Sequence, residues 1–592
     1  MPGFFKKNII TKKVLFSLFV SLLTIPSFAQ VHINEIMISN IDGLMVDYDY
    51  PDSWIEVFNS SDVDIDLKGY SVKHVDEDGE VIYTIPVSAI VPQHGFIVIL
   101  CDKVNDGLHT PFRLDADGGT LTLVAPNGEE VSKMEYPAML APQVGYARTT
   151  DGGSDWQWEK DATPGKSNTG VFCDELLPNP VFSITGKIMS SSETLTISNP
   201  ASGRAKLLVT LNGEEPTPTN AQVYDSECSL IIDKTMVVRA KLVSDNALSP
   251  RSVTQSYIFH PRATHHPIIS IVTDSIHYYN EESGIFSSAK TFNGKFNYAQ
   301  DWRRPANFEF FTTTGQKAVF NQLGETAVGG NSTRSRRQKS LKCYSKKRFG
   351  TKHFDATFWD TKPNVTKLKS FVIRNAGNNF SRGRINDGFI QTLFGHRITN
   401  LDWQAYTPCI GYINGQYNGI YGLRERSNDD YIWANYDKED NIEIVASYLE
   451  KLARGTSFVD FIKVWSNPNV TFEELDPLMD IDEFLNHFCL EAFSGNRDYV
   501  VNNINMWRPK KEGGKWRWIT KDVDDTGVAN PPYSLDDIIS FNSIRFLTNT
   551  ATEGSIEAER IGGNAIFTKE SLFYLKSATI IQYTIKGRFM SR

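Results

Sequence analysis

The sequence predicts a multi-domain protein in which two β-sandwich domains precede one domain of mixed α and β structure. The chain has 592 residues, and at about 150 residues per domain this length corresponds to roughly four units. Up to about residue 259, polar and apolar side chains alternate as they do in strands, whereas helical spacing begins after Pro267. Hydrophobic residues make up 40% of the chain and charged residues 22%, values that exclude a disordered or polytopic membrane protein.

The charge balance argues against nucleic acid as a partner. The formal net charge is -9, and nucleic-acid binding usually needs a basic surface. The six cysteines are scattered without a C-x-x-C pair, so we expect them to be small core residues and not a disulfide framework.

The first 29 residues have the pattern of a signal peptide. Four lysines lie between positions 6 and 13, an apolar run covers 14–25, and small residues precede a predicted cut after Ala29. We therefore expect an exported protein (periplasmic, cell-surface or secreted) with no transmembrane span in the mature chain. The alternative is an uncleaved anchor, but the apolar run is shorter than the ~20 residues that a spanning helix needs.

The first predicted β domain covers residues 30–170. Residues 120–124 alternate and are followed by Asn127-Gly128, a hairpin signal. The stretches 33–36, 52–59, 67–70 and 163–165 resemble the lamin-tail domain, an immunoglobulin-like sandwich.

Acidic side chains in this domain allow two interpretations. Asn34, Glu35, Asp52 and Glu56 supply the hard oxygen ligands that suit Ca²⁺. The alternative, which we favour, is that these acids make hydrogen bonds at the edge of the sandwich.

The second predicted β domain covers residues 171–260. Residues 205–211 alternate as a strand before Asn212-Gly213, and residues 209–217 resemble the small sandwich found at the C-terminus of some chitobiases and hexosaminidases. The resemblance implies contact with a glycan, although a spacer between larger modules is the favoured interpretation. Residues 261–266 form a predicted linker to the third domain, 267–592.

The third domain begins with cations beside a glycine-containing turn. Lys339 and Lys342 lie in a predicted strand, and residues 329–334, ending in Arg334, form a turn whose amides can approach an anion. Residues 384–396 have helical spacing, and the predicted apolar face contains Ile385, Phe389, Leu393 and Phe394. We expect Asp387 on that helix to face Lys339 or Lys342.

A loop farther along has the spacing of a kinase catalytic loop. Asp498 follows an arginine and precedes Asn503 by five positions, and a predicted hairpin then leads to Asp522 and Asp524. A carboxylate that orients a hydroxyl, and oxygen ligands for Mg²⁺, are what phosphoryl transfer requires. Asp498 suits the first role, and Asn503, Asp522 and Asp524 suit the second. The loop motif alone occurs by chance, so the prediction depends on the whole ordered set, which includes Glu425 at the end of a hairpin.

Residues 267–528 resemble the CotH family of atypical protein kinases. The matching stretches are 267–272, 284–286, 330–334 with 339–341, 373–378, 421–425, and 498–503 followed by 518–524. The resemblance implies a kinase-like two-lobe fold, Mg²⁺ and ATP, and a protein substrate phosphorylated on Ser or Thr. It assigns Asp498 as catalytic acid/base and Asp522 as a metal ligand. Contact with the nucleotide is then expected from Lys339, Lys342, Asp387, Glu425 and Arg334.

Two departures from the family pattern leave a second function open. Lys521 replaces the usual aromatic residue before Asp522, and the sequence after 528 is short for a C-terminal lobe, which we expect to be truncated. The main prediction is an exported kinase acting on an extracytoplasmic protein. The alternative is a non-catalytic protein that binds an envelope component or glycan at the cell surface and is built on a degenerate kinase fold.

Overall fold

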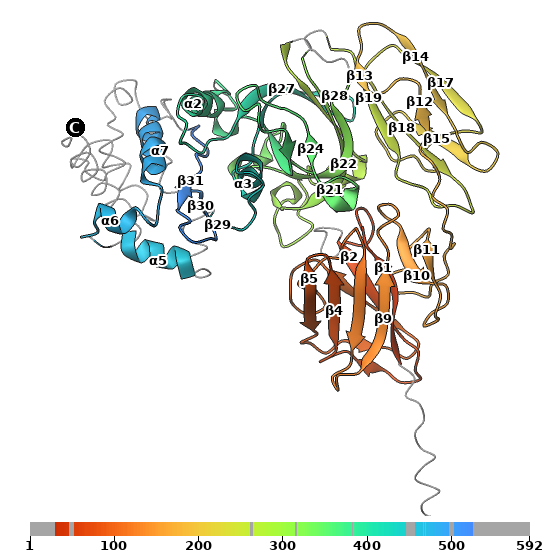
Figure 1. Ribbon diagram of the computed structural model, residues 1–592. Coiled ribbons are helices and arrows are strands. Elements are labelled where there is room, and N and C mark those ends of the chain that lie inside the picture. Colours follow the sequence, from red (N-terminus) through yellow and green to blue (C-terminus); the bar gives the residue numbers. More distant parts are fainter. Residues whose placement is uncertain are drawn as a thin grey trace, which may run out of the picture. The chain divides into compact units, whose positions relative to one another are not determined.

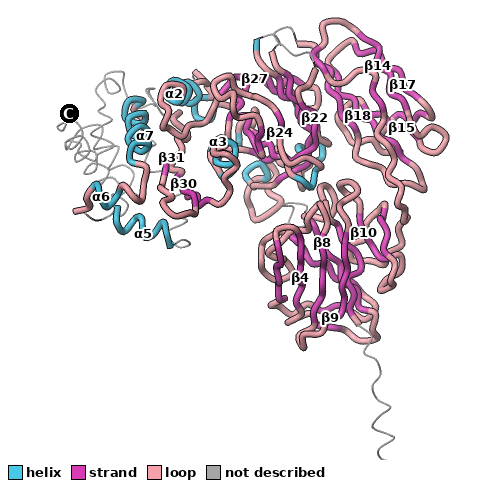
Figure 2. Tube along the Cα trace, viewed as in Figure 1, coloured by secondary structure: helices cyan, strands magenta, loops and turns pink. Residues whose placement is uncertain are grey.

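The computed structural model describes residues 30–45, 52–260, 265–313, 317–381, 383–445, 456–465, 467, 469–496 and 503–524. The predicted signal peptide, Asp498 and everything after Asp524 lie outside this range. The described chain is mostly β, and its few helices lie mainly in the C-terminal part (Figure 2). None of the helices in these ranges has the length and apolarity that crossing a membrane requires.

Contacts divide the chain into two compact units. The first holds the described residues up to Leu177 together with Val243–Pro250, and the second holds Pro178–Leu242 and the described residues from Arg251 onward.

The first unit is built from two main antiparallel sheets that share one core (Figure 1). Residues of both sheets, such as Val57 and Leu121, lie in one buried apolar cluster. The predicted hairpin at Asn127-Gly128 is confirmed, because Gly128 has φ +89°, a conformation that glycine adopts without strain. In spatial order, one sheet contains β11 (Trp156–Glu159), β10 (Gly145–Arg148), β1 (Val31–Met37), β2 (Ser53–Asn59) and β7 (Phe96–Cys101). The other contains β5 (Gly79–Thr84), β4 (Ser71–Asp76), β8 (Gly119–Val124) and β9 (Glu130–Tyr136), and β3 (Ile65–Asp66) pairs with β6 (Ile90–Val91).

The second unit begins with a smaller pair of sheets. One sheet contains β12 (Val181–Phe182), β14 (Glu193–Ser198) and β17 (Glu227–Ile232). The other contains β13 (Lys187–Ile188), β19 (Val253–Ile258), β18 (Met236–Val243), β15 (Lys206–Thr210) and β16 (Gln222–Tyr224). The structure thus contains the predicted second set of strands.

A closed seven-stranded barrel follows in the same unit. Its interior is apolar and contains Leu341, Phe371 and Leu423, all inaccessible to solvent. Asn414 and Gly415, with positive φ angles of 47° and 73°, form the tight turn between β27 and β28. In spatial order the strands are β20 (Ile268–Val272), β21 (Arg303–Phe311), β22 (Phe320–Val328), β23 (Leu341–Tyr344), β26 (Ser370–Arg374), β28 (Gln416–Arg424) and β27 (Tyr406–Ile413).

The small sandwich packs directly on this barrel. Ile258 and Ile268 share an apolar cluster with Phe311, and the Ser256 amide donates to Oε1 of the buried Glu309 at 3.1 Å. The Oγ atoms of Ser256 and Ser270 lie 2.9 Å apart in the same buried contact. The module predicted as a spacer is therefore fixed to its neighbour by apolar and polar contacts.

A helical part with a three-stranded sheet completes the described chain. Its core is aromatic, and Trp465, Trp516 and Trp518 are buried together. Helix α7 (Ile481–Ser494) is capped by Asp480, which accepts a hydrogen bond from the Glu483 amide, and it ends at Gly495. The helices are α3 (Asp429–Asn435), α5 (Thr456–Trp465), α6 (Phe472–Leu475) and α7 (Ile481–Ser494), and the strands are β29 (Ile442–Val445), β30 (Met506–Pro509) and β31 (Arg517–Trp518).

Helix α2 (Asn386–Gly395) forms where the sequence predicts a helix but packs on a different face. The predicted apolar face is wrong for its first two residues, since Ile385 and Phe389 are 51% and 55% exposed, whereas Phe394 packs against a buried apolar cluster. The helix instead buries Asp387, Gly388 and Gln391. A Cβ on Gly388 would collide with the ring of Tyr406, so the missing side chain allows this close approach.

All six cysteines are free, as expected. Cys101, Cys228, Cys343 and Cys409 are buried core residues, whereas Cys489 is exposed and Cys173 is half-buried, so the core expectation holds for four of them.

Candidate functional site

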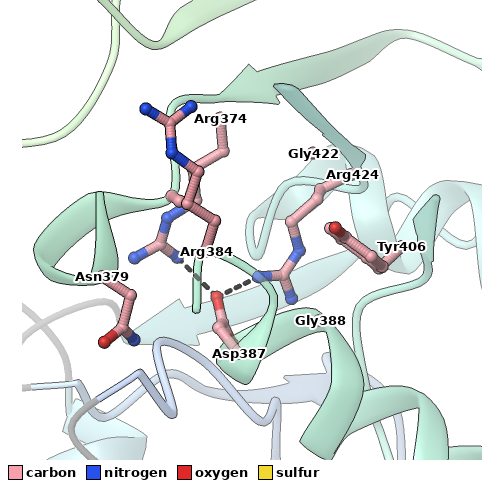
Figure 3. Close-up of a pocket in the computed structure, with 9 residues that line it drawn as sticks. Arg374, Asn379, Arg384, Asp387, Gly388, Tyr406, Gly422 and Arg424 are labelled. Atoms are coloured by element: carbon pink, nitrogen blue, oxygen red, sulfur yellow. Dashed lines mark hydrogen bonds and ion pairs between the residues drawn. The ribbon is translucent and has the colours of Figure 1, made fainter. Parts of the chain in front are cut away.

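Three acidic side chains distant in sequence meet at one arginine. Arg374, the last residue of β26, extends its Nη1 to Oδ2 of Asp387 at 2.7 Å. Its Nη2 contacts Asp522 and lies 3.0 Å from Oδ2 of Asp524. Figure 3 shows Asp387 between Arg374 and Arg424, the last residue of β28. The fold thus brings the predicted residues Asp387, Asp522 and Asp524 together.

Asp387 is the buried centre of this cluster. Besides Arg374 it pairs with Arg424, and its Oδ1 accepts hydrogen bonds from Gln391 Nε2 at 2.8 Å and the Val523 amide at 3.2 Å. Burial by itself would raise the pKa of Asp387, but Arg424 and Arg374 lower it below its ordinary value. Asp387 is therefore an anion that joins α2, two barrel strands and the segment after β31.

Asp522 and Asp524 have the geometry of paired cation ligands. Both carboxylates contact the same nitrogen of Arg374, so a single cation at that position would meet an oxygen from each. Asp522 has φ +54°, an unusual backbone conformation for a residue with a side chain, and Asn379 Nδ2 holds the Asp524 carbonyl at 2.7 Å. Two hard oxygen donors fit Mg²⁺, which is usually held by one or two carboxylates and water.

Asn503 and Asp498 are the other residues of the predicted catalytic loop. Asn503 is buried at the start of the segment that leads into β30. Asp498 lies outside the described residues, so its predicted role stays a prediction.

The predicted phosphate-contacting cations form a second group. Lys339 lies just before β23 and donates from Nζ to the Arg334 carbonyl at 2.7 Å. Arg334 in turn contacts Asp301 at 2.6 Å, and Lys342 lies 3.8 Å from the same carboxylate. Burial lowers the pKa of Lys339 and of Lys342 to about 8. The structure thus places Arg334 and Lys342 at one exposed acid, Asp301, and Lys339 beside the backbone of Arg334.

The expectation that Asp387 faces Lys339 or Lys342 is wrong, and the barrel register gives the reason. Lys342 pairs with Val372, and Val372 pairs with Arg424, so the three side chains share the outer face of the barrel. Strand β26 separates Lys342 from Arg424, which places the two backbones about 9.6 Å apart. The arginine on β28 is therefore nearer to α2, which packs against the adjacent β27.

Glu425 belongs to a separate buried ion pair. Its carboxylate contacts Lys362 Nζ at 2.6 Å and accepts hydrogen bonds from the Ala405 amide at 2.8 Å and Asn435 Nδ2 at 2.7 Å. Lys362 also donates to the Trp403 carbonyl at 2.7 Å. These contacts tie α3 and the 403–405 segment to the end of β28, so they favour a structural role over the predicted nucleotide contact.

Sequence reasoning missed three cations that these acids contact. Arg374 and Arg424 lie in the stretches 373–378 and 421–425, which resemble the CotH family, but no motif gives either arginine a role of its own. An arginine at the end of a predicted strand, close in sequence to Asp387 on the predicted helix, is the sequence signal that could have indicated this ion pair. No motif marks Lys362, because its partner is 63 residues away in the sequence.

In the first unit, hydrogen bonding accounts for the acids considered for Ca²⁺. Asp52 is held by two 2.7 Å contacts from Arg113. Glu35 accepts a hydrogen bond from the Thr163 amide at 3.1 Å, and Glu56 accepts from the Gly165 amide at 2.6 Å and from Asn34 Nδ2 at 3.1 Å. Glu35 and Glu56 thus fasten the segment that contains Thr163-Pro164-Gly165. These acids make hydrogen bonds, as the favoured interpretation holds, but the predicted place is wrong, because both are buried on the interior strands β1 and β2 and do not lie at the edge of the sheet.

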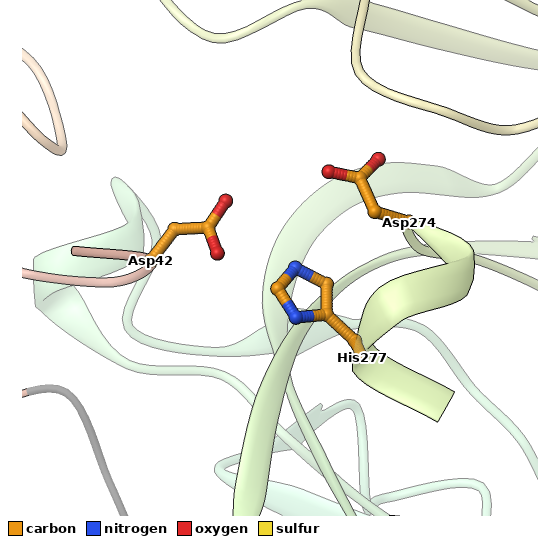
Figure 4. A group of neighbouring side chains, drawn as sticks. All are labelled: Asp42, Asp274 and His277. Atoms are coloured by element: carbon orange, nitrogen blue, oxygen red, sulfur yellow. The ribbon is translucent and has the colours of Figure 1, made fainter. Parts of the chain in front are cut away.

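Another acid near a histidine also has a structural explanation. Asp274 precedes α1 (Ser275–Tyr279), and His277 lies on that helix (Figure 4). Asp274 accepts a hydrogen bond from Arg239 Nη1 at 2.8 Å. Because Arg239 lies on β18, this ion pair is part of the contact between the small sandwich and the barrel.

The cluster around Arg374 lies within a segment that matches a known family. Residues 327–550 match the family model for the CotH kinase protein. Residues 25–138 match the model for the Lamin Tail Domain. Both resemblances predicted from the sequence are thereby confirmed, and the CotH kinase match contains Arg374, Asp387, Arg424, Asp522 and Asp524. The resemblance of residues 209–217 to chitobiase-type sandwiches stays a prediction.

Other comparisons add little. No curated protein matches the sequence. Among solved structures, red sea bream transglutaminase is similar at 12% identity over 39% of this chain and 32% of its own, with a TM-score of 0.13. A likeness at that level carries no argument about fold or function.

Proposed function

We propose that this chain is an exported CotH-like protein kinase that transfers the γ-phosphoryl group of ATP to a Ser or Thr hydroxyl of an extracytoplasmic protein. The observation that carries the proposal is the convergence of Asp387, Asp522 and Asp524 on Arg374 within the CotH-matched segment. Paired acids beside a cationic barrel face are what a metal–triphosphate substrate requires. In this proposal the barrel belongs to the first lobe of a kinase-like fold, and α5–α7 with the β29–β31 sheet belong to the second.

Each group has a distinct part in the proposed reaction. Asp522 and Asp524 would hold Mg²⁺, which neutralises phosphate charge when bound. Lys339 and Lys342 would contact the phosphates, and Asp498 would orient the acceptor hydroxyl and accept its proton. The hydroxyl oxygen forms a bond to the γ-phosphorus as the bond to the β–γ bridging oxygen breaks, and ADP leaves.

The contacts of Arg374 add a condition to this proposal. Its Nη2 occupies the position between the two acids that a metal ion would take. Metal binding must therefore displace this guanidinium, because two cations cannot share the site. Asp387 remains as an anchor for Arg374 through Nη1.

Nucleotide binding tests the proposal most directly. We would follow thermal unfolding of the mature protein with ATP, with and without Mg²⁺, for the wild type, Asp522→Asn and Asp498→Ala. At ~100 times its Kd a ligand stabilises the folded state by roughly 2.7 kcal/mol, so binding shifts the Tm measurably. We expect a Mg²⁺-dependent shift that Asp522→Asn removes and Asp498→Ala retains. Asp460→Asn, at an acid whose side chain is 68% exposed on α5, is the matched control.

Transfer activity provides the second readout. Labelled γ-phosphate should reach protein with the wild type and not with Asp498→Ala. If ATP with Mg²⁺ causes no shift, or if Asp522→Asn shifts as the wild type does, the proposed kinase site is wrong. The chain would then be better explained as a non-catalytic surface protein on a degenerate kinase fold.

A further inference from the structure

Asp522 lies between two fixed points of the chain. Its φ angle of +54° is unusual for a residue with a side chain, and such a conformation persists only where the surrounding structure holds it. The fixed point after it is Val523, whose amide donates to Oδ1 of Asp387 at 3.2 Å and whose side chain is buried beside Leu490 of α7. The fixed point before it is Thr520, two residues upstream.

Thr520 is held by its backbone and by its side chain. The residue is inaccessible to solvent, and its amide donates to the Asp402 carbonyl at 2.8 Å. Its Oγ1 lies 3.1 Å from Nδ1 of His487, a residue of α7 that is 2% exposed. Burial lowers the pKa of His487 to about 3, so the imidazole is neutral. The contact between the two side chains is therefore a hydrogen bond and not an ion pair.

The spacing of residues on α7 matches the spacing of the segment that leads to Asp522. Helix α7 lies beside β31 (Figure 1). One turn before His487, Oε2 of Glu483 accepts a hydrogen bond from the Trp518 amide at 2.9 Å. Four residues of helix rise about 6 Å and two residues of strand about 6.6 Å. Successive turns of α7 therefore meet alternate residues, Trp518 and Thr520, and hold this segment in register.

Packing alone does not require a histidine at position 487. Replacing both partners of a buried hydrogen bond by apolar groups of the same shape is often nearly neutral for stability. Apolar groups do not supply a directional bond, however, and the bond from His487 fixes the rotation of the Thr520 side chain. Its consequence is felt two residues later, where the backbone turns through the positive φ angle of Asp522.

We propose that His487 is a positioning residue for the metal site: by holding Thr520, it fixes the backbone that presents the Asp522 carboxylate to a divalent cation. His487 has this role only if Asp522 binds metal, so the proposal rests on the proposed function. It adds a residue that lies outside the acids and cations assigned to the reaction.

Titration of the full-length protein with Mn²⁺, followed by electron paramagnetic resonance, tests this proposal. His487→Leu and Thr520→Val each remove one side of the hydrogen bond and should raise the Kd about tenfold, the lower end of what residues that orient metal ligands contribute. Because both variants remove the same contact, the double variant should raise the Kd no further. His487→Asn retains a polar group at the δ position and should retain the wild-type Kd.

A matched control separates positioning from stability. Phe488→Leu, at the next residue of α7, removes buried apolar contacts from the same helix and leaves the contact between His487 and Thr520 in place. It should lower the Tm and leave the Kd for Mn²⁺ unchanged.

The same titrations distinguish failure of this proposal from failure of the proposed function. If His487→Leu and Thr520→Val bind Mn²⁺ as Phe488→Leu does, while Asp522→Asn binds it more weakly, His487 is not a positioning residue and the metal site stands. If Asp522→Asn binds Mn²⁺ as the wild type does, both proposals are wrong. Because valine has nearly the shape of threonine, Thr520→Val provides the test even where His487→Leu does not fold.

Discussion

Glu159 should make the first unit less stable as the pH rises. This glutamate on β11 is fully buried, and its Oε1 accepts a hydrogen bond from the Gly170 amide at 3.1 Å. Among the described residues, Oε2 has no hydrogen-bond partner. Burial raises the pKa of Glu159, and burial together with the charge of Glu159 raises the pKa of the neighbouring Glu35. The folded protein therefore retains a proton that the unfolded chain loses above about pH 4.5.

The substitution Glu159→Gln isolates this effect. In the variant, the side-chain amide oxygen can still accept a hydrogen bond from the Gly170 amide. The amide N–H₂ group replaces Oε2, the oxygen without a partner, and can donate to the neighbouring Glu35 carboxylate. A raised carboxyl pKa lowers stability as the pH rises above the unfolded value, by about 1.4 kcal/mol per pH unit for one proton. The variant lacks this pH dependence. We therefore expect the free energy of unfolding of the variant, relative to that of the wild type, to rise by about 1.4 kcal/mol from pH 5 to pH 6.

Hydrogen exchange of peptides from β1 and β2 in the full-length protein measures this gain. After correction for intrinsic exchange, the protection of the variant relative to the wild type should rise about tenfold from pH 5 to pH 6. Glu135→Gln, at an exposed glutamate on β9, should show a constant ratio. A constant ratio for Glu159→Gln as well would refute the argument that Glu159 is protonated in the folded state.

Two further predictions concern the second unit. Lys362→Met should lower the free energy of unfolding, measured by urea denaturation, by about 3–5 kcal/mol, because it leaves the Glu425 carboxylate buried without its cation. Adding Glu425→Gln should restore part of the lost stability. Equal stability of Lys362→Met and the wild type would contradict this prediction. Arg374→Gln should lower the Kd for Mn²⁺ severalfold, because it removes the guanidinium that competes with the metal for Asp522 and Asp524. Electron paramagnetic resonance measures this Kd. An unchanged or higher Kd would show that the guanidinium does not compete with the metal.

The sequence predicted local structure best where a short motif has one low-energy solution. Asn127-Gly128 and Asn414-Gly415 form turns because their backbones need positive φ angles, which glycine and asparagine tolerate. The end of α7 at Gly495 follows the same rule, with φ +64°. The confirmed resemblances to the CotH kinase and lamin-tail families likewise depend on contiguous stretches of sequence.

The orientation of α2 shows where such reasoning fails. The helical period locates the helix, but the residues that it buries fully are Asp387, Gly388 and Gln391, while the apolar Ile385 and Phe389 are exposed. Its inward face is chosen by Asp387, which meets two arginines from strands 13 and 37 residues away in sequence. Pairing a buried charge outweighs the preference of Phe389 for burial, and glycine contacts with aromatic rings set the distance of approach.

The sequence by itself determined the strand-rich N-terminal half, the family of each matched segment and which acids to consider. Only the tertiary structure decided which cation each acid meets, because barrel register and helix packing join residues as far as 150 positions apart. Asp387 pairs with Arg374 and Arg424, and Glu425 pairs with Lys362. Each of these pairings follows from a balance of desolvation and charge that exists only after the chain has folded.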